Sequence, residues 1–496
     1  MGGVSFAINL GGGMYLGLDL GTSGLRALLV DGSGEVVGDA QHAYPVDHPH
    51  SGWSEQNPAH WVDATRAVIG EIRARFGQQF AALKAIGLSG QMHGATLLNA
   101  DGQVLRPCLL WNDTRAAPQA FDLDADPAFR DVSGNIVFPG FTAPKVKWVA
   151  ENEPDLFGRV AKVLLPKDYL RYWLTGDYVS DMSDSAGTSW MDVGARCWSE
   201  DLLAKSGMRL DQMPTLVEGS QVTGTLHAKL AADWGVSPSV VVVGGGGDNA
   251  AAACGVGCFE EGDGFVSLGT SGVLLAGKSS FSPSPQAAVH TFCHAVPDAW
   301  YQMGVILAAT DCLNWLSSIL GPDPAHLSGL MADIIQGPGA VRFLPYLSGE
   351  RTPHNDSRIR GAFLGLDVAT GHAELTQAVL EGVAFALRDN LEALKGTGTN
   401  LNRVLAIGGG SNSSYWLQLI ATVLNLPLDL PEKGEFGAAL GAARLAIVGH
   451  TGASISSVMT RPKVARTIEP SVAQSAAYQA AYADYRALYP AIKAIT

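Results

Sequence analysis

The pentapeptide LGTSG occurs twice in this 496-residue chain, at residues 20–24 and 268–272. Each copy follows one apolar run and precedes another, in MYLGLDLGTSGLRALLV and in GFVSLGTSGVLLAG. Apolar runs on both sides of a glycine-bounded turn predict two strands joined as a hairpin. The same hairpin half a chain apart predicts two related units with similar architecture.

The segments around the hairpins indicate an α/β fold. Residues 14–41 read as a meander of three strands, and NPAHWVDATRAVIGEIRARF has apolar residues at helical spacing. After residue 240, buried strands alternate with glycine turns and helices, including a small-residue helix in EFGAALGAARLAIVG. We therefore expect two α/β lobes with a cleft between them, joined near residues 259–264 by a packed hinge.

Composition excludes several classes of protein. The formal net charge of −14 disfavours nucleic acid as a partner. Six cysteines in so long a chain do not form a disulfide scaffold. Glycine, proline or charge interrupts every long apolar segment, so we expect no membrane span and a cytoplasmic protein. Residues 1–13, which lack the features of a signal peptide, are expected to be a leader outside the fold.

The Gly-Thr-Ser-Gly turn offers backbone N–H groups and two hydroxyls to an anion. A single turn of this kind commonly does no more than connect two strands. Two copies in matching contexts favour a polyphosphate held by both turns. Asp19 precedes the first copy and Ser267 the second, so the first turn alone has a carboxylate suited to Mg²⁺. This asymmetry indicates one metal-assisted site rather than two independent ones.

Two further glycine clusters follow predicted strands. In GGGGDNAAAA, Asp248 opens a small-residue helix, where the helix dipole should keep it ionised near neutral pH. Aspartate at this place is also an ordinary helix cap, but an ionised carboxylate beside glycines can accept a proton from a substrate hydroxyl. The cluster GGGSNSS, residues 408–414, could form a backbone shelf for a nucleotide.

Two longer patterns resemble the signatures of the FGGY carbohydrate kinases, in the actin/sugar-kinase/Hsp70 superfamily. They are GFTAPKVKWVAEN at residues 140–152 and GAFLGLDVATGHAELTQAVLE at residues 361–381. The resemblance runs from about residue 14 to 447. It implies two ribonuclease H-like (actin/hexokinase-type ATPase) lobes with an interlobe cleft. The implied sugar-binding domain is residues 14–258, and the implied nucleotide-binding domain is residues 259–496.

The resemblance also implies roles for individual residues. Asp248 falls on the catalytic base, and Asp19 on the aspartate linked to Mg²⁺, with Asp248 as its second ligand, directly or through water. The implied sugar contacts are Met92, His93, Trp111, Asp113, Asp248 and Asn249, with Asn112 nearby. The implied ATP contacts are Thr22, Ser23, Thr270, Ser271, Asn314, Gly409, Gly410 and Ser414.

Shorter stretches indicate which sugar the implied kinase phosphorylates. WSEQNP, QMHGATLL, LLWNDTR, SDMSDSAGTSW and FLPYLSGERTPHND are similar to those of family members that phosphorylate D-xylulose. The implied activity is therefore ATP-dependent formation of D-xylulose 5-phosphate in pentose catabolism. The alternatives are another FGGY kinase acting on ribulose, glycerol, gluconate or fucose derivatives, a phosphatase or ATPase of the same fold, and a non-enzymatic actin- or Hsp70-like nucleotide-binding protein.

Three features remain outside this assignment. HTFCH, residues 290–294, has metal-ligating residue types but no second ligand cluster, so we expect no transition metal. ERTPHND, residues 350–356, is either a solvated or interlobe loop or part of a site. The C-terminal segment SAAYQAAYADYRALYPAIKAI predicts a helix docked on the second lobe, with a homodimer contact as the alternative.

Overall fold

The computed structural model describes residues 12–332, 334–432 and 437–495. All but the last two residues of the expected leader, 1–13, lie outside the described residues. The chain divides into two compact units. The first comprises Met1–Gly257, Phe292–Ala299 and Phe436–Arg461, and the second comprises Cys258–Thr291, Trp300–Glu435 and Pro462–Thr496.

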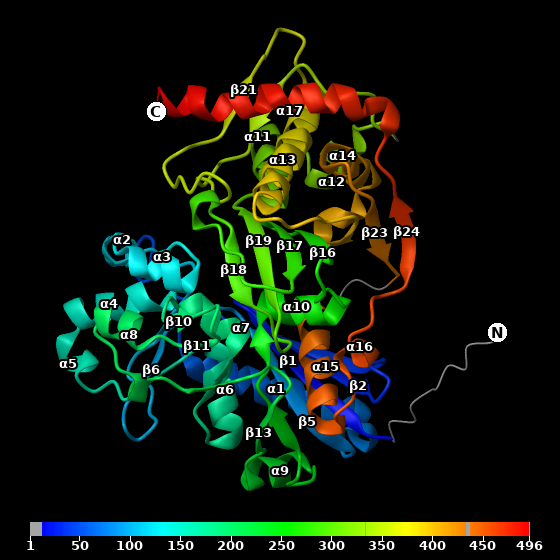
Figure 1. Ribbon diagram of the computed structural model, residues 1–496. Coiled ribbons are helices and arrows are strands. Elements are labelled where there is room, and N and C mark those ends of the chain that lie inside the picture. The colour runs from blue at the N-terminus through cyan, green and yellow to red at the C-terminus, as the bar shows by residue number, and fades with distance from the viewer. Residues whose placement is uncertain (1–11, 333, 433–436, 496) are drawn as a thin grey trace. The chain divides into compact units, whose positions relative to one another are not determined.

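The first unit is built on a sheet whose strands run in the order β13-β14-β5-β1-β2-β3, with β15 paired to β5 (Figure 1). The strands are β1 (Met14–Leu20), β2 (Gly24–Asp31), β3 (Val36–Ala43), β5 (Leu83–Gly90), β13 (Val222–Thr225), β14 (Val241–Val243) and β15 (Gly246–Gly247). The helices of this unit include α1 (Pro58–Phe80), α4 (Thr142–Asn152), α6 (Pro166–Thr175), α9 (Ala228–Trp234), α10 (Asp248–Val256) and α15 (Gly437–Thr451). The expected meander, β1 to β3, is confirmed.

Shorter elements complete the first unit, and several of them carry the loops of the candidate site. They are β4 (Glu55–Gln56), β6 (Thr96–Leu98), β7 (Cys108–Leu109), α2 (Ala117–Asp124), α3 (Pro127–Ser133), α5 (Pro154–Phe157), β8 (Lys162–Leu164), β9 (Val179–Asp181), α7 (Met182–Ser185), η1 (Ala186–Thr188), β10 (Met191–Asp192), β11 (Cys197–Trp198), α8 (Glu200–Lys205), η2 (Leu210–Gln212), β12 (Thr215–Val217) and α16 (Ile455–Val458).

The second unit has a sheet in the order β18-β19-β17-β16-β22-β23-β24. Its strands are β16 (Gly264–Leu268), β17 (Gly272–Lys278), β18 (His290–Cys293), β19 (Trp300–Ile306), β22 (Val404–Ile407), β23 (Leu428–Pro431) and β24 (Val464–Ile468). The last two residues of β18 are assigned to the first unit. The other elements are η3 (Pro285–Ala287), α11 (Thr310–Leu320), α12 (Pro324–Gly329), β20 (Arg342–Leu344), β21 (Ala362–Leu364), α13 (His372–Lys395), η4 (Gly409–Asn412), α14 (Ser414–Leu424) and α17 (Val472–Lys493).

The two sheets repeat one topology. In the first, the neighbours along β3-β2-β1-β5-β14-β13 pair antiparallel, antiparallel, parallel, parallel and antiparallel. The neighbours along β19-β17-β16-β22-β23-β24 pair in the same succession of directions. The expected fold class, two ribonuclease H-like α/β units, is confirmed. Both LGTSG turns join the first two strands of their unit.

Helix α15 comes late in the chain but packs on the sheet of the first unit. A Cβ atom on Gly17 of β1 would lie 1.9 Å from the carbonyl oxygen of Ala439, and one on Gly87 of β5 would lie 1.9 Å from that of Ala442. A Cβ atom on Gly441 would lie 1.7 Å from the carbonyl oxygen of Ala251 in α10. Glycines at these positions let α15 contact the strands and α10 backbone to backbone, as its small-residue composition predicts.

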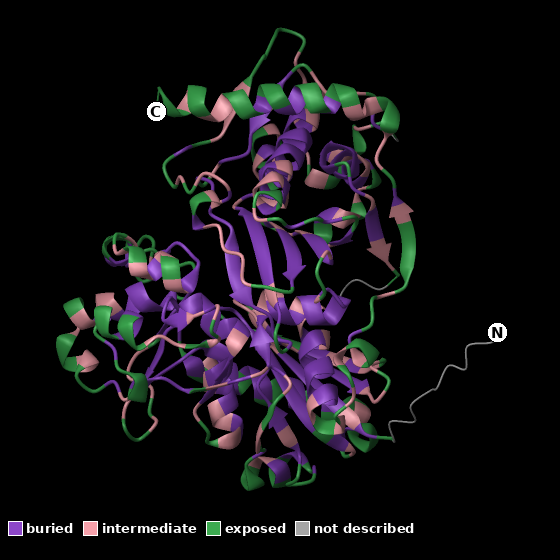
Figure 2. Ribbon diagram, viewed as in Figure 1, coloured by how far each residue is buried: buried purple, intermediate pink, exposed green. Residues whose placement is uncertain are grey.

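Burial follows the sheets of both units. The central strands of each sheet are buried, whereas the outer helices show exposed faces (Figure 2). Helix α17 buries Tyr478, Tyr482 and Tyr485 on the second unit, which confirms its expected docking there. Among the described residues, no helix combines the length and the apolar character needed to cross a membrane.

Candidate functional site

Asp248 lies where a strand end meets a helix start. Strand β15 runs parallel to the end of β5, and α10 begins directly after it, with Gly247 as its N-cap and Asp248 as its first residue. The Oδ1 atom of Asp248 accepts hydrogen bonds from the backbone nitrogen of Asn249 at 2.6 Å and from its Nδ2 at 2.8 Å. Asn249 therefore orients the Asp248 carboxylate.

Burial and a second carboxylate govern the protonation of Asp248. Burial, followed by the negative charge of Asp19, raises the pKa of Asp248 to about 7, and the hydrogen bonds from Asn249 oppose this shift. The helix dipole was expected to keep Asp248 ionised near neutral pH; with a pKa of about 7 the carboxylate is instead about half protonated there, because burial opposes its ionisation. Burial also raises the pKa of Asp19, against the effects of Ser89 and Arg26. Carboxylate oxygens are ligands that Mg²⁺ prefers, so the residue types of Asp19 and Asp248 fit the predicted metal site, which stays a prediction.

Met92 and His93 follow β5 on the loop beside α10. Met92 is buried, and a Cβ atom on Gly247 would lie 3.0 Å from its Cγ. His93 has a φ of 70°. Its ring stacks on Phe141 at 4.3 Å between centroids, and its Nδ1 lies 2.7 Å from the carbonyl oxygen of Gly187. The structure thus brings Met92 next to the backbone that carries Asp248, and it holds His93 against Phe141 and Gly187.

The first LGTSG turn is held by side chains from four other segments. Trp111, 44% exposed, donates from Nε1 to the hydroxyl oxygen of Thr22 at 2.9 Å. That hydroxyl donates to Oε1 of Gln91 at 3.2 Å, and Gln56 donates to the Thr22 carbonyl oxygen at 2.6 Å. Tyr44 donates to the carbonyl oxygen of Gly21 at 2.6 Å. Predicted phosphate and sugar contacts, Thr22 and Trp111, therefore touch each other.

Asp113 has different surroundings from the other predicted sugar contacts. Its carboxylate is fully buried and accepts from the backbone nitrogen of Ser54 at 2.7 Å and from NH2 of Arg115 at 2.7 Å. Arg115 also pairs with Glu55, and its guanidinium lies 3.5 Å from the centre of the Trp53 ring. These contacts make Asp113 an anchor of the loop that carries Trp111 and the exposed Asn112, and its direct contact with sugar stays a prediction.

The second LGTSG turn is built into its own unit by backbone contacts. Ala309 and Thr310, at the start of α11, donate to the carbonyl oxygens of Thr270 at 2.7 Å and Gly269 at 3.0 Å. Thr270 and the neighbouring Ser271 are exposed. A Cβ atom on Gly410 would lie 2.8 Å from the Cβ of Leu268. The turn and the predicted nucleotide shelf are therefore neighbours.

The remaining predicted nucleotide contacts also lie in the second unit. Asn314 is exposed on α11, and Gly409 is exposed at the start of η4. Ser414 begins α14 and is exposed, and its hydroxyl accepts from NH2 of Arg466 at 3.1 Å. Their contacts with a nucleotide stay predictions.

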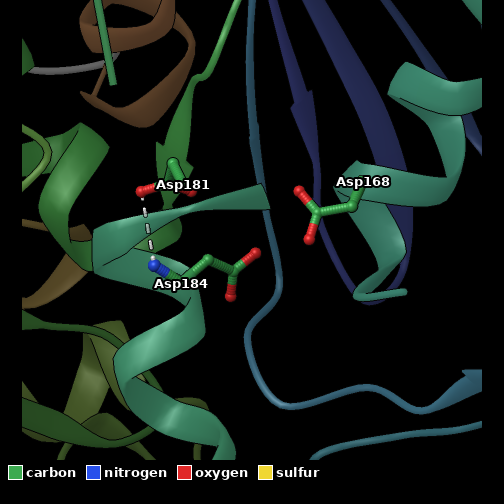
Figure 3. Close-up of side chains that lie close together, drawn as sticks. All are labelled: Asp168, Asp181 and Asp184. Atoms are coloured by element: carbon green, nitrogen blue, oxygen red, sulfur yellow. Dashed lines mark hydrogen bonds between the residues drawn. The ribbon is translucent and has the colours of Figure 1, made fainter. Parts of the chain in front are cut away.

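The first unit contains a buried ionic cluster, formed by Lys167 and three aspartates, that was not predicted from the sequence. The carboxylates of Asp168, Asp181 and Asp184 lie close enough to share a metal ion, and Figure 3 shows Asp181 and Asp184 on one turn with Asp168 across from them. The Nζ of Lys167 lies 2.5, 2.7 and 3.4 Å from these three carboxylates. The ammonium group therefore takes the place a metal ion would have. In the sequence, the only sign of this cluster in LLPKDYLR, residues 164–171, is the charged pair Lys167 and Asp168 next to apolar residues.

The HTFCH residues are engaged by the protein. The Cys293 thiol donates to the carbonyl oxygen of Val193 at 3.4 Å, and Nδ1 of His294 accepts from the backbone nitrogen of Val296 at 3.3 Å. His290 lies 3.5 Å from NH1 of Arg351. In ERTPHND, Glu350 is buried and accepts from the backbone nitrogens of Leu307 and Arg351. These contacts indicate structural roles for both segments.

Comparisons with known proteins agree with the duplicated topology. Residues 14–255 match the FGGY family of carbohydrate kinases, N-terminal domain, and residues 264–450 match its C-terminal domain. The chain is 45% identical over 481 residues to the xylulose kinase of Escherichia coli (strain K12), covering 96% of this chain and 98% of that one.

Solved structures give the same result. A crystal structure described as a xyloylose kinase from Brucella ovis is 59% identical, has a TM-score of 0.96 and covers 97% of this chain and 100% of that one. The xylulose kinase from Rhodospirillum rubrum is 30% identical, with a TM-score of 0.90 over 97% of this chain and 99% of that one. With both family domains matched and a relative 45% identical over nearly its full length, this chain belongs to the FGGY family of carbohydrate kinases.

Proposed function

We propose that this enzyme transfers the γ-phosphoryl group of ATP to the 5-hydroxyl of D-xylulose, giving D-xylulose 5-phosphate and ADP. The observation that carries the chemistry is Asp248, a half-buried carboxylate with a pKa of about 7 at the start of α10. The relatives named xylulose kinase support the choice of sugar. The reaction belongs to pentose catabolism in the cytoplasm.

In this proposal Asp248 orients the attacking hydroxyl and accepts its proton late in the transfer. A general base of this kind contributes ~10²–10⁴-fold to the rate, and most of the remaining acceleration comes from positioning and charge stabilisation. Met92 and His93 contact the sugar on the side of β5, and Asn249 keeps one oxygen of Asp248 fixed. Trp111 also contacts the sugar, and Asp113 contributes by anchoring the loop that carries Trp111.

The phosphate donor engages the two LGTSG turns in this proposal. Thr22 and Ser23 in the first unit and Thr270 and Ser271 in the second bind its phosphates. Gly409 and Gly410 lie under the nucleotide, with Asn314 and Ser414 on its adenine side. Asp19 and Asp248 would hold Mg²⁺, directly or through water, and the ion would neutralise charge on the phosphates.

A panel of sugars and polyols in a coupled ADP assay tests the substrate. We expect D-xylulose to give the highest kcat/KM, and the product to carry its phosphate at position 5. Faster turnover of ribulose, glycerol, gluconate or a fucose derivative would assign the enzyme to another branch of the family. Release of phosphate at a rate that none of the sugars raises would favour an ATPase or phosphatase. A homodimer remains part of the proposal, to be measured by light scattering.

A further inference from the structure

We infer that Ser183 is a positioning residue for Asp248, acting through the backbone nitrogen of Gly247. This inference rests on the proposed role of Asp248 as the base. Ser183 lies on α7 and is fully buried, so it does not itself meet solvent or substrate. It links the buried ionic cluster to the residue directly before Asp248.

The hydrogen bonds of Ser183 fix the direction of this link. Its hydroxyl donates to Oδ2 of Asp181 and accepts from the backbone nitrogen of Gly247 at 3.1 Å. Because a carboxylate oxygen can only accept, the hydroxyl proton points to Asp181 and a lone pair of the oxygen points to Gly247. The serine therefore holds the Gly247 N–H with an oriented acceptor.

Asp181 is itself immobilised from both sides. Its Oδ1 lies 2.7 Å from Nζ of Lys167, and its Oδ2 also accepts from the backbone nitrogen of Ser183 at 2.7 Å, which caps α7. Lys167 and Asp181 have fully buried side chains. Removing one partner from such a buried pair is costly, so the cluster is a rigid base for the serine.

Gly247 transmits this rigidity to the candidate base. It is the N-cap of α10, and a Cβ atom there would lie 3.0 Å from Cγ of Met92 and 3.4 Å from Cα of Asp184. The Met92 side chain and the Asp184 backbone therefore lie close to the chain on one side where it enters α10. Loss of the hydrogen bond that Gly247 donates to Ser183 would leave the N–H of Gly247 without this acceptor and let the start of α10, with Asp248, move. A displacement of about 1 Å in a catalytic group can cost roughly 10²-fold in rate.

Ser180 provides a matched control. Its hydroxyl lies in the same buried region, donates to Oδ2 of Asp168 at 2.6 Å and lies 2.7 Å from the hydroxyl of Ser185. Neither of these two hydrogen bonds involves Gly247. Ser180→Ala and Ser183→Ala therefore remove the same kind of group next to the same cluster, and only the second removes the contact with the start of α10.

The experiment compares kcat, both KM values and the melting temperature of Ser183→Ala and Ser180→Ala with D-xylulose and ATP. We expect roughly a 10- to 100-fold lower kcat for Ser183→Ala with the KM for ATP nearly unchanged, and a kcat within about twofold of wild type for Ser180→Ala. Equal kcat values for the two variants would overturn the inference. Should Ser183→Ala fail to fold, Ser183→Cys keeps a weak acceptor of similar size, and its kcat should fall below that of Ser180→Ala.

A double variant separates this inference from the proposed function. If Ser183 acts through Asp248, adding Ser183→Ala to Asp248→Asn lowers kcat no further, whereas independent effects would multiply. A multiplied loss would refute the inference while leaving the base assignment intact. Full activity of Asp248→Asn alone would instead refute the base assignment.

Discussion

At the scale of single residues, the proton on Asp248 controls the proposed reaction. Its pKa of about 7 means that the carboxylate is about half protonated at neutral pH. Only the ionised form can accept the hydroxyl proton. We therefore expect kcat/KM for the sugar to fall about tenfold per pH unit as the pH drops below about 7.

This profile is measured from pH 5.5 to 9 at subsaturating sugar and a fixed, saturating ATP concentration, with circular dichroism at each pH to show that the enzyme stays folded. Mg²⁺ bound at Asp19 and Asp248 favours the ionised form, so raising its concentration should move the acid limb to lower pH. A flat profile down to pH 5.5 at low Mg²⁺ would contradict the assignment.

The sequence predicted residues at this scale where a motif fixes the backbone around them. Asp248 follows four glycines, and Met92 follows a buried strand; the structure places both beside Gly247. The surroundings of the Asp113 carboxylate could not be predicted from a motif. Its partners, Ser54 and Arg115, include one 59 residues away, and only the folded chain shows that they occupy its oxygens.

At the scale of elements, the contact between α10 and α15 supports the helix that begins with Asp248, the proposed base. A Cβ atom on Gly441 would overlap the carbonyl oxygen of Ala251, so Gly441→Ala must push α15 away from α10. We expect this variant to lose about 1–3 kcal/mol of stability, as overpacked cores do, together with activity. Gly70→Ala in α1, where nothing lies within 4 Å, serves as the control and should be neutral or slightly stabilising. Equal melting temperatures for the two variants would refute this packing argument.

The contact between His354 and α17 leads to a prediction about how the stability of the protein depends on pH. The ring of His354 stacks on Tyr489 of α17 at 3.6 Å, and its Nε2 lies 3.1 Å from the hydroxyl of Tyr346. Burial lowers the pKa of His354 to about 4; Asp356 opposes the shift, and Lys493 and Arg486 reinforce it. The folded state thus binds a proton less readily than the unfolded state, and stability falls as the pH drops from about 6.5 to 4, by about 3 kcal/mol in total.

Urea unfolding of wild type and His354→Phe at pH 7 and pH 4.5 measures this effect. The phenylalanine keeps the ring against Tyr489 but cannot titrate. We expect wild type to lose about 2–3 kcal/mol more than the variant between the two pH values. An equal loss in both proteins would show that His354 does not couple pH to stability.

The two LGTSG turns have identical residues but different strand registers. In the first hairpin Leu20 pairs with Leu25, whereas in the second Leu268 pairs with Gly272, one residue tighter. Tyr44 holds the first turn from its own unit, and the start of α11 holds the second. Composition predicted both hairpins, but the neighbours of each turn determine its register.

At the scale of the whole molecule, the duplication predicted from two pentapeptides extends to six strands in each sheet with the same pairing directions. The apolar runs and the turn residues between them made this duplication predictable. The assignment of Phe436–Arg461 to the first unit could not be predicted, because it depends on close approaches between glycines and carbonyl groups far apart in sequence.

A kinase of this kind also makes a prediction about water. Asp248 is not fully buried, so water can take the place of the sugar hydroxyl as acceptor. We expect slow release of phosphate from ATP and Mg²⁺ in the absence of sugar, and its loss in Asp248→Asn. A rate equal to that of buffer alone would count against this expectation.

The most direct test of the central claim is D-xylulose phosphorylation by Asp248→Asn, with ATP affinity measured in parallel by calorimetry. The variant keeps the size of the side chain and removes its basicity. We expect kcat to fall by at least ~10²–10⁴-fold while the Kd for ATP stays close to that of wild type. Turnover equal to wild type would show that Asp248 is not the base.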